Sequence, residues 1–399
     1  MKNRIAKRMS TLSPSLTLAI SAKAKAMKSA GESVVSFGVG EPDFNTPEHI
    51  INSAKSALDN GFTKYTPSSG LLPLRKAICE KFQRDNGLTY EPSQIIVSNG
   101  AKHSIFNACY AVLEEGDEVI IPAPYWLTYP EVVKVCGATP VYIDCKKENK
   151  FKFSAEDLKK AITPKTKMLI FNSPSNPTGA VYNEEETRAI AKVCEEAGIF
   201  VLADEIYEKL CYNGVKPFSI ASCSEKMQDL TITINGVSKT YAMTGWRVGY
   251  LGAPKDIAKA IDSFQSHATS NACSISQYAT IEALKSTDEE IQAMVEVFDK
   301  RRQKLLALID EIDGVQAIEP DGAFYVMMVV SDLYGKSYNG KVIENSIEFA
   351  DMLLDAEKVA TVPGVSFGAD DCVRLSYALS EADLEEGLKR IKKFVSQLK

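Results

Sequence analysis

The sequence predicts an α/β protein with two parts: a large domain built on a mostly parallel sheet sandwiched by helices, and a smaller α+β domain. The chain has 399 residues, which is too long for one small core. From about residue 94 onward, short runs of β-branched residues alternate with amphipathic stretches. Near-continuous apolar strands that alternate with helices are typical of a parallel sheet covered on both faces.

The strands of this large sheet are expected at short apolar runs. These lie at residues 94–98, 118–122, 139–144, 167–171, 199–203, 231–235 and 248–252. The amphipathic stretches 154–162 and 183–198 predict helices between strands. The second stretch has acidic residues in its first turn and Gly198 near its end, which suits the helix dipole and a C-terminal cap.

The C-terminal part of the chain has a different pattern. A charged helical region at about 288–313 precedes expected strands at 322–330 and 372–377 and expected helices at 342–356 and 381–398. We therefore expect a large domain over residues 46–290 and a small domain formed by residues 1–45 and 291–399, with the N-terminal segment completing the small domain.

Composition narrows the class of protein. The net charge of −6 argues against nucleic acid as a partner, because phosphate binding needs a basic surface. The nine cysteines are scattered without a C-x-x-C pair, which favours reduced thiols over disulfides or a metal site. No apolar run reaches membrane-spanning length, and no apolar segment follows the basic start of the chain. A cytoplasmic protein is expected.

Three candidate sites follow expected strands, where ligands bind in open α/β sheets. Gly100, Ala101 and Lys102 would start a helix and offer backbone N–H groups to an anion; an ordinary turn is the alternative. Asp204 directly follows an apolar strand, where it needs a cationic partner or serves as a helix N-cap. Asn176 lies in the turn-rich stretch NSPSNPTG, which on its own predicts only a loop.

The stretch GVSKTYAMTGWRVG, residues 236–249, is more specific. It places Lys239 among small and apolar neighbours, where burial lowers the pKa of an amine and makes it a nucleophile. Ser238 and Arg247 suit phosphate binding, Arg247 through its bidentate fork. An amine nucleophile, a phosphate site and a carboxylate for a pyridine nitrogen together match the needs of pyridoxal phosphate.

The chain resembles a known family, the class I aminotransferases of pyridoxal-phosphate fold type I. Within that family it most resembles the prokaryotic-type aspartate aminotransferases. The resemblance runs nearly from end to end. It rests on PSLTLAI (14–20), GEPDFNTPEHI (40–50), KYTPSSGLLPLRKAI (64–78), PYWLTYPE (124–131), NSPSNPTGAVY (172–182), DEIYE (204–208), SKTYAMTGWRVGY (238–250), PDGAFYV (320–326) and VRLSYA (373–378).

The resemblance implies a role for each residue around the cofactor ring. Lys239 would hold pyridoxal phosphate as an imine and act as general base and then general acid. Asp204 would pair with the pyridine nitrogen. Tyr207 and Asn176 would hydrogen-bond the phenolic oxygen, and Trp126 would stack on the ring; a plain core aromatic is the alternative for Trp126.

The resemblance also implies a phosphate site and a dimer. Gly100, Ala101, Ser238 and Arg247 would hold the phosphate. Tyr65 would reach it from a neighbouring subunit, so a homodimer with shared active sites is expected.

For the substrate, the resemblance implies that Arg374 forms a bidentate pair with the α-carboxylate, with Gly40 and Asn176 assisting. Lys102, which is also expected to contact the cofactor, would meet the distal carboxylate of aspartate or glutamate. Ser15 and Thr17, in the N-terminal segment, would close over the same carboxylate.

The expected reaction moves the amino group of L-aspartate to 2-oxoglutarate with ping-pong kinetics. Two alternatives within the family stay open: an aminotransferase with aromatic or broad specificity, and a β-lyase. Relatives that also aminate prephenate tend to carry a lysine where this chain has Ser13, which argues against that activity. A ligand-sensing regulator is disfavoured because no DNA-binding segment or basic helix is recognisable.

Overall fold

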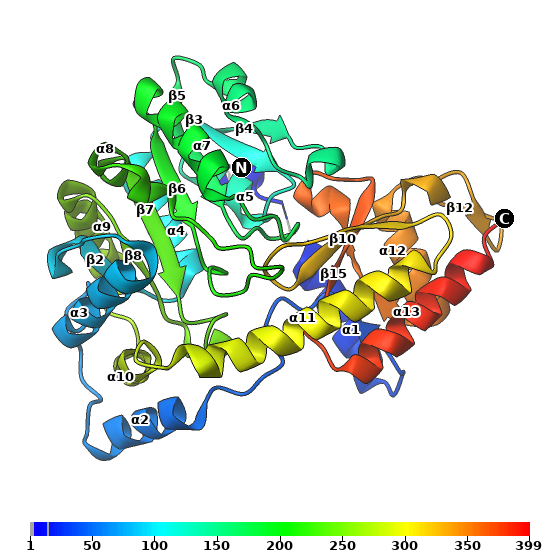
Figure 1. Ribbon diagram of the computed structural model, residues 1–399, viewed down its shortest axis with the longest axis horizontal. Coiled ribbons are helices and arrows are strands. Elements are labelled where there is room, and N and C mark those ends of the chain that lie inside the picture. The colour runs from blue at the N-terminus through cyan, green and yellow to red at the C-terminus, as the bar shows by residue number, and fades with distance from the viewer. Residues whose placement is uncertain (1–3, 14–15) are drawn as a thin grey trace.

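The computed structural model describes residues 4–13 and 16–399. Within them, the predicted fold class is confirmed: a seven-stranded mixed sheet flanked by helices forms one half, and a four-stranded antiparallel sheet with its own helices forms the other (Figure 1). Ser15 and the side chain of Thr17 lie outside the described residues.

The large sheet has the strand order β2-β8-β7-β6-β5-β3-β4. Its strands are β2 (Ile95–Ser98), β3 (Glu118–Ala123), β4 (Thr139–Asp144), β5 (Thr166–Asn172), β6 (Phe200–Asp204), β7 (Thr231–Gly236) and β8 (Gly249–Gly252). All seven match the strands expected from the sequence. Strand β8 is antiparallel to both of its neighbours, whereas the other pairings are parallel.

The strands are apolar throughout because both faces of this sheet are buried. In β6, Val201 and Ala203 pack into the core on one face, while Leu202 between them packs into the core on the other face. The same alternation holds in β5, where Leu169 and Ile170 point to opposite cores. Successive side chains of a strand point to opposite faces, so a continuous apolar run is required here.

The helices cover both faces of the sheet and build most of the second half. They are α1 (Leu16–Ser29), α2 (Glu48–Asp59), α3 (Leu72–Lys81), α4 (Ala101–Val112), α5 (Thr128–Val135), α6 (Ala155–Ala161), α7 (Glu184–Ala197), α8 (Glu225–Asp229), α9 (Lys255–Ala268), α10 (Ser274–Ala283), α11 (Asp288–Asp310), α12 (Ser346–Glu357) and α13 (Glu381–Ser396). A π-type turn, η2 (Phe82–Asn86), continues α3.

Among the described residues, seven short 3₁₀ turns complete the helical segments. They are η1 (Lys7–Thr11), η3 (Pro92–Gln94), η4 (Lys147–Asn149), η5 (Ile220–Cys223), η6 (Thr244–Trp246), η7 (Ser331–Leu333) and η8 (Gly364–Phe367).

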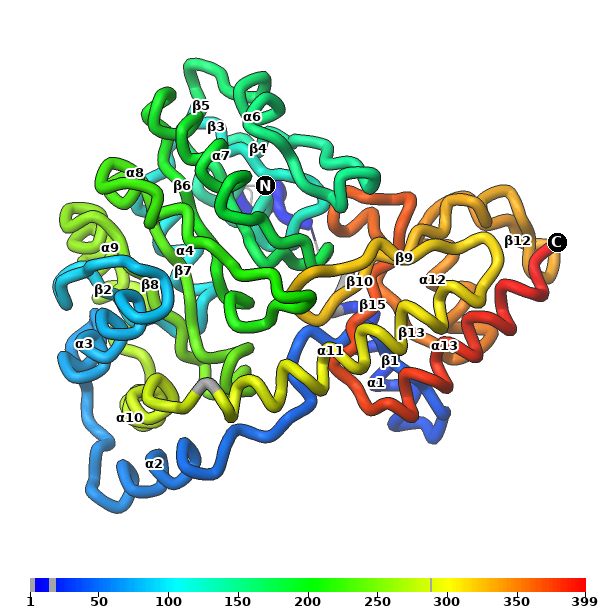
Figure 2. Tube along the Cα trace, in the orientation of Figure 1, coloured from blue at the N-terminus to red at the C-terminus, as the bar shows by residue number. Residues whose placement is uncertain are grey.

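The second half contains the order β14-β15-β10-β9 and two small strand pairs, β1-β13 and β11-β12. Its strands are β1 (Val35–Ser36), β9 (Gln316–Ile318), β10 (Tyr325–Val329), β11 (Ser337–Tyr338), β12 (Lys341–Val342), β13 (Val359–Ala360), β14 (Val362–Pro363) and β15 (Cys372–Ser376). The N-terminal helix α1 lies in this half, where it contacts β13 and β14 (Figure 1). The long helix α11 runs from one half to the other, which the tube in Figure 2 shows clearly.

One predicted helix begins later than expected. The sequence pattern predicts a helix over 342–356, but residues 341–342 pair in β12 and α12 begins at Ser346. The reason is local, since the side chain of Asn345 accepts hydrogen bonds from the amides of Ile347 and Glu348 and caps the helix there.

Among the described residues, no helix is both long enough and apolar enough to cross a membrane. The same residues contain no group of three or more histidine, cysteine, aspartate or glutamate side chains arranged to hold a metal ion.

Candidate active site

Lys239 follows β7 and lies at the meeting point of the two halves. Its Nζ donates a hydrogen bond to the carbonyl of Gly40 at 2.5 Å. Burial lowers the pKa of this ammonium group to about 8; the carboxylate of Glu41 opposes that shift, and the charges of Arg374 and Arg247 add to it. A large fraction of Lys239 is therefore a neutral amine near pH 8, the form that attacks a carbonyl carbon.

Asp204 is the last residue of β6 and is only 3% exposed. Its carboxylate accepts hydrogen bonds from the hydroxyl of Tyr129 at 2.7 Å and from the amide of Ile206 at 3.2 Å. Burial raises the pKa of Asp204 to about 6, against the effect of these two donors and of the Lys239 charge. A cationic N–H group placed beside this carboxylate would be stabilised, as a protonated pyridine nitrogen requires.

Tyr207 lies three residues after Asp204 and is buried. Its hydroxyl is 3.0 Å from the hydroxyl of Tyr325, which comes from β10 in the second half. The ring of Tyr207 is 5.8 Å from Nζ of Lys239. Tyr207 thus lies near Lys239. The sequence did not single out Tyr325, because a tyrosine inside an apolar strand is indistinguishable from a core residue.

The expected phosphate site is built on the first turn of α4, where a helix leaves its N–H groups without intrahelical partners. Arg247 lies against this turn and donates to the carbonyl of Asn99 at 3.3 Å. A Cβ atom at Gly100 would lie 2.2 Å from a guanidinium nitrogen of Arg247, and one at Gly249 would lie 2.1 Å from the amide nitrogen of Ala101. Glycine at position 100 therefore allows the guanidinium of Arg247 to lie against the α4 turn, and glycine at position 249 allows β8 to lie against the same turn.

Three further predicted residues have the following surroundings. Ser238 is buried beside Lys239. Trp126 packs edge to face against Tyr129, with ring centroids 5.4 Å apart. Nζ of Lys102 lies 4.8 Å from the centroid of the Trp126 ring, and burial together with the charge of Arg247 lowers the pKa of Lys102. The side chain of Lys102 is exposed overall, but its amine lies beside the Trp126 ring, so its role toward a substrate stays a prediction.

Arg374 brings a buried positive charge from β15 into the site. It is 2% exposed, and its guanidinium donates to Oδ1 of Asn176 at 3.0 Å and to the carbonyl of Gly38 at 3.2 Å. The rings of Tyr325 and Phe367 flank it at 4.4 and 5.0 Å.

Within the described part of the chain, no carboxylate pairs with Arg374, and its Nε has no hydrogen-bond partner. A buried guanidinium with an unused N–H group fits an incoming carboxylate, which it can bind in a bidentate way.

Asn172 holds the loop that carries Asn176, although the sequence did not single it out. Its amide nitrogen donates to the carbonyl of Asp204 at 2.9 Å, and its Oδ1 accepts from the amide of Asn176 at 2.9 Å. Its place at the end of an expected strand, two residues before a proline, was the only signal in the sequence.

One predicted residue does not join the others in the single chain. The side chain of Tyr65 is 92% exposed, in the segment between α2 and α3. No other large apolar or aromatic side chain of the described residues approaches this exposure.

The residues that come together fit pyridoxal phosphate. The Lys239 amine suits its aldehyde, the buried carboxylate of Asp204 its pyridine nitrogen, and the Tyr207 hydroxyl its phenolic oxygen. The α4 N-terminus with Arg247, held close by Gly100, suits its phosphate.

Comparisons with known proteins identify the family of this chain. A family model described as aminotransferase class I and II matches residues 32–391. An aspartate aminotransferase of Bacillus subtilis (strain 168) is 50% identical over 394 residues, 99% of each chain. The crystal structure of an aspartate aminotransferase from Rhizobium meliloti has a TM-score of 0.96 at 43% identity, with both chains fully covered.

A structure of aspartate aminotransferase from Thermus thermophilus with maleate has a TM-score of 0.92 at 40% identity, covering 98% of this chain and 100% of that one. The family model spans most of the chain, and the Bacillus relative is covered almost completely. This chain belongs to the class I and II aminotransferases.

Proposed function

We propose that this aminotransferase uses pyridoxal phosphate to move the amino group of L-aspartate to 2-oxoglutarate, forming oxaloacetate and L-glutamate. The observation that carries the substrate assignment is a pair of cations in one site. One is Arg374, whose charge is near enough to Lys239 to lower its pKa. The other is Lys102, beside Arg247, because the charge of Arg247 lowers the pKa of both Lys102 and Lys239. With Arg247 assigned to the cofactor phosphate, Arg374 and Lys102 suit a substrate with two carboxylates.

The relatives support a dicarboxylate substrate. The Bacillus subtilis relative is named for aspartate, and the Thermus thermophilus structure holds maleate, which is itself a four-carbon dicarboxylate.

Each residue has a defined task in this proposal. Bound pyridoxal phosphate would supply an aldehyde and a ring that accepts electrons. Arg374 binds the α-carboxylate, and Lys102 binds the distal carboxylate. Lys239, as a neutral amine, would remove the proton from the substrate α-carbon and hold it for return, so one group would serve as base and then acid.

Asp204 and Tyr207 tune the ring in this proposal. The carboxylate of Asp204 would keep the pyridine nitrogen protonated, because a buried anion favours the nearby positive charge. The hydroxyl of Tyr207 would hydrogen-bond the phenolic oxygen, together with Asn176. Trp126 would stack on the ring, Gly100, Ala101 and Ser238 would hold the phosphate with Arg247, and Gly40 would assist Arg374.

We also propose a cytoplasmic homodimer in which Tyr65 completes the phosphate site of the neighbouring subunit. Its 92% exposure is what such a role requires, since an aromatic side chain gains little by pointing into water. The large domain is proposed to cover 46–290 and the small domain 1–45 with 291–399; α11 would then continue from one domain into the other.

Absorbance spectroscopy of the purified protein with pyridoxal phosphate tests the function. Aspartate alone should replace the cofactor's visible band by the band of the amino form, and 2-oxoglutarate should restore it. Lys102→Ala should reduce the preference for aspartate over alanine by about ten- to a hundredfold, the value of a hydrogen bond to a charged group. Lys192→Ala, on an exposed part of α7, is the matched control and should change nothing.

Other outcomes assign the alternatives. A faster response to tyrosine than to aspartate would indicate an aromatic aminotransferase. Release of ammonia without an oxo-acid acceptor would indicate a β-lyase. Absence of any visible band with added cofactor would contradict the role of Lys239.

A further inference from the structure

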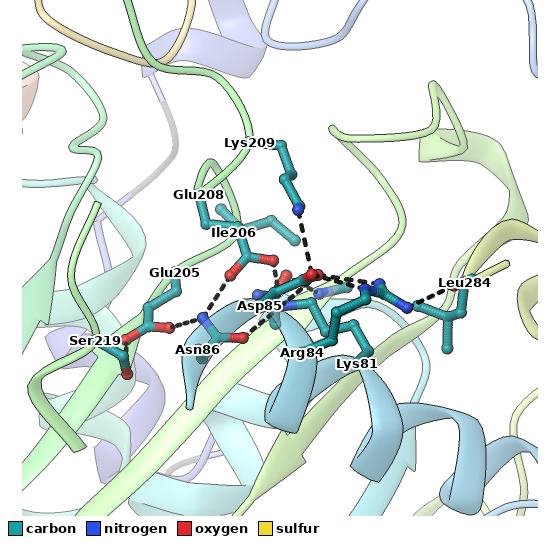
Figure 3. A network of polar contacts seen from close by, with 12 residues as sticks. Lys81, Arg84, Asp85, Asn86, Glu205, Ile206, Glu208, Lys209, Ser219 and Leu284 are labelled. Atoms are coloured by element: carbon teal, nitrogen blue, oxygen red, sulfur yellow. Dashed lines mark hydrogen bonds and ion pairs between the residues drawn. The ribbon is translucent and has the colours of Figure 1, made fainter. Parts of the chain in front are cut away.

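The side chains of the turn after β6 point in two opposite directions. Asp204 and Tyr207 point to the candidate active site, whereas Glu205 and Glu208, from the same turn, point to the opposite side and are also buried. There they meet a cluster of polar side chains at the end of α3 (Figure 3). The same five-residue stretch therefore forms one wall of the site and one wall of a separate polar cluster.

Asn86 is the centre of this cluster. Its amide nitrogen donates to Oε2 of Glu205 at 3.1 Å and to Oε2 of Glu208 at 2.7 Å. Its Oδ1 accepts from Nζ of Lys81 at 2.7 Å, and Lys81 is also ion-paired with Glu208. The hydroxyl of Ser219 donates to the other oxygen of Glu205 at 2.6 Å. One amide thus bridges two carboxylates and an ammonium group.

The charged side chains of Lys81, Glu205 and Glu208 are buried, whereas Asn86 is half-buried. Lys81 is 2% exposed and Glu208 is 6% exposed. Buried charges are stable only when paired, and removal of one partner leaves an uncompensated charge. Burial, followed by the charge of Glu208, raises the pKa of Glu205 to about 8, which shows how far this carboxyl is removed from solvent. Asp85, paired with Lys81 and Lys209, closes the cluster toward the surface.

The π-type turn η2 brings Asn86 to this place. Helix α3 would carry its last residues onward along its own axis, but η2 widens the final turn and ends at Gly87, whose φ of 67° is left-handed. A single π turn inserted at a helix end is frequent near functional sites. Here it turns Asn86 toward the segment after β6.

The anchored carboxylates constrain the site through the backbone. The amide of Glu205 donates to the carbonyl of Ile234 in β7, and the amide of Glu208 donates to the carbonyl of Glu205, both at 3.0 Å. Between these two anchors lies Ile206, whose amide donates to Asp204 at 3.2 Å. A shift of Glu205 or Glu208 would therefore move a donor to Asp204 and the backbone of Tyr207.

We propose that Asn86 is a positioning residue for the reaction: by bridging Glu205, Glu208 and Lys81 it holds the turn after β6 so that Asp204 and Tyr207 align with the cofactor ring. This inference rests on the proposed roles of Asp204 and Tyr207. Asn86 itself touches neither substrate nor cofactor.

The test compares Asn86→Ala with the milder Ser219→Ala and with the conservative Glu205→Gln. Asn86→Ala should weaken cofactor binding and slow the aspartate half-reaction, each by about tenfold or more, because a misplacement of about 1 Å can cost roughly a hundredfold in rate. KM for aspartate should change less than twofold, since Arg374 and Lys102 are untouched. The pH at which the cofactor's absorbance band changes should also shift.

The other two variants should have smaller effects on cofactor binding and rate than Asn86→Ala. Ser219→Ala removes one donor to Glu205, so its effects should have the same direction and a smaller size. Glu205→Gln keeps an acceptor for Asn86 and a partner for Ser219, so its spectrum and rates should stay close to those of the original protein.

Asn345→Ala is the control for a purely structural loss. Asn345 caps α12 in the other half, so this variant should lose stability while its cofactor spectrum and rates stay unchanged. If Asn86→Ala loses stability in the same way without a change in spectrum or rate, the positioning role is wrong. If Asn86→Ala does not fold, Ser219→Ala decides, and an unchanged spectrum and rate in that variant overturns the proposal.

The original protein separates this inference from the proposed function. If it binds no pyridoxal phosphate, the proposed function fails and the inference falls with it. If it binds the cofactor and responds to aspartate while the variants match it, only the inference fails.

Discussion

Lys239 shows how one side chain acquires its chemistry from its surroundings. An exposed lysine has a pKa near 10.5, but burial near two arginines lowers the pKa of Lys239 to about 8, and Glu41 limits the shift. The neutral fraction of the amine therefore reaches one half near pH 8 instead of near pH 10.5.

The pH dependence of cofactor uptake follows from this pKa. The rate at which the cofactor-free protein takes up pyridoxal phosphate should rise with pH and level off above about 8, because only the neutral amine attacks the aldehyde. Stopped-flow absorbance measures it. Glu41→Gln should move the midpoint to lower pH, since the charge of Glu41 favours the ammonium form. A rate that still climbs at pH 10 would contradict the lowered pKa.

The residues that the sequence identified have polar or charged side chains within apolar surroundings, either at the end of an expected strand or in a distinctive motif. Lys239, Asp204 and Arg374 are of this kind, and the structure brings all three to one site. Tyr325 and Asn172 contact the same site, but one resembles a core residue and the other a loop residue. Side chains whose role depends on a partner distant in the chain leave no local signal.

At the scale of elements, α7 is defined by its own ends. The side chain of Asn183 accepts from the amide of Glu186, and the side chain of Glu186 accepts in return from the amide of Asn183. Gly198, with a φ of 66°, ends the helix. Such reciprocal caps satisfy amides that would otherwise lack partners.

Asn183→Ala should therefore lower the free energy of unfolding by about 1 kcal/mol. Urea unfolding measures this change, and the aspartate reaction should be unaffected, because α7 carries none of the site residues. Asn183→Asp keeps an N-cap oxygen and should unfold close to the original midpoint. An equal loss in both variants would contradict the capping explanation.

Strand positions were predictable because a strand buried on both faces must be apolar along its whole length. The order of the strands was not, since neither the place of β8 between β2 and β7 nor its reversed direction leaves a mark in its four residues. The start of α12 was also missed, because Asn345 caps the helix within a stretch whose mixed apolar and polar pattern is compatible with a longer helix.

At the scale of the whole molecule, the site exists only where the two halves meet. Arg374 from β15 donates to Asn176 from the loop after β5, and Tyr325 from β10 meets Tyr207 from the turn after β6. Asp43, in the segment between β1 and α2, is held by two hydrogen bonds from Arg301 in α11 at 2.7 and 2.9 Å. Movement of one half against the other would therefore act directly on the substrate groups.

The proposed dimer predicts complementation between two defective chains. Tyr65→Ala and Lys239→Ala should each be impaired alone. Co-expressed, they should recover about a quarter of the original activity, since half of a random mixture is hybrid and each hybrid has one intact site. Arg374→Ala mixed with Lys239→Ala is the control and should recover nothing, because both residues serve the same chain's site. Equal recovery in both mixtures would contradict a shared site.

The sequence by itself determined the α/β class, the strands of the large sheet, the family and the residues with distinctive local motifs. These follow from periodicity and from residue types that few positions can hold. The tertiary structure alone decided that Tyr325 and Asn172 belong to the site, that Tyr65 stands apart from it, and that Asn86 lies behind Asp204. The position of each of these residues depends on contacts between segments that are far apart in the chain. A local sequence pattern does not determine such contacts.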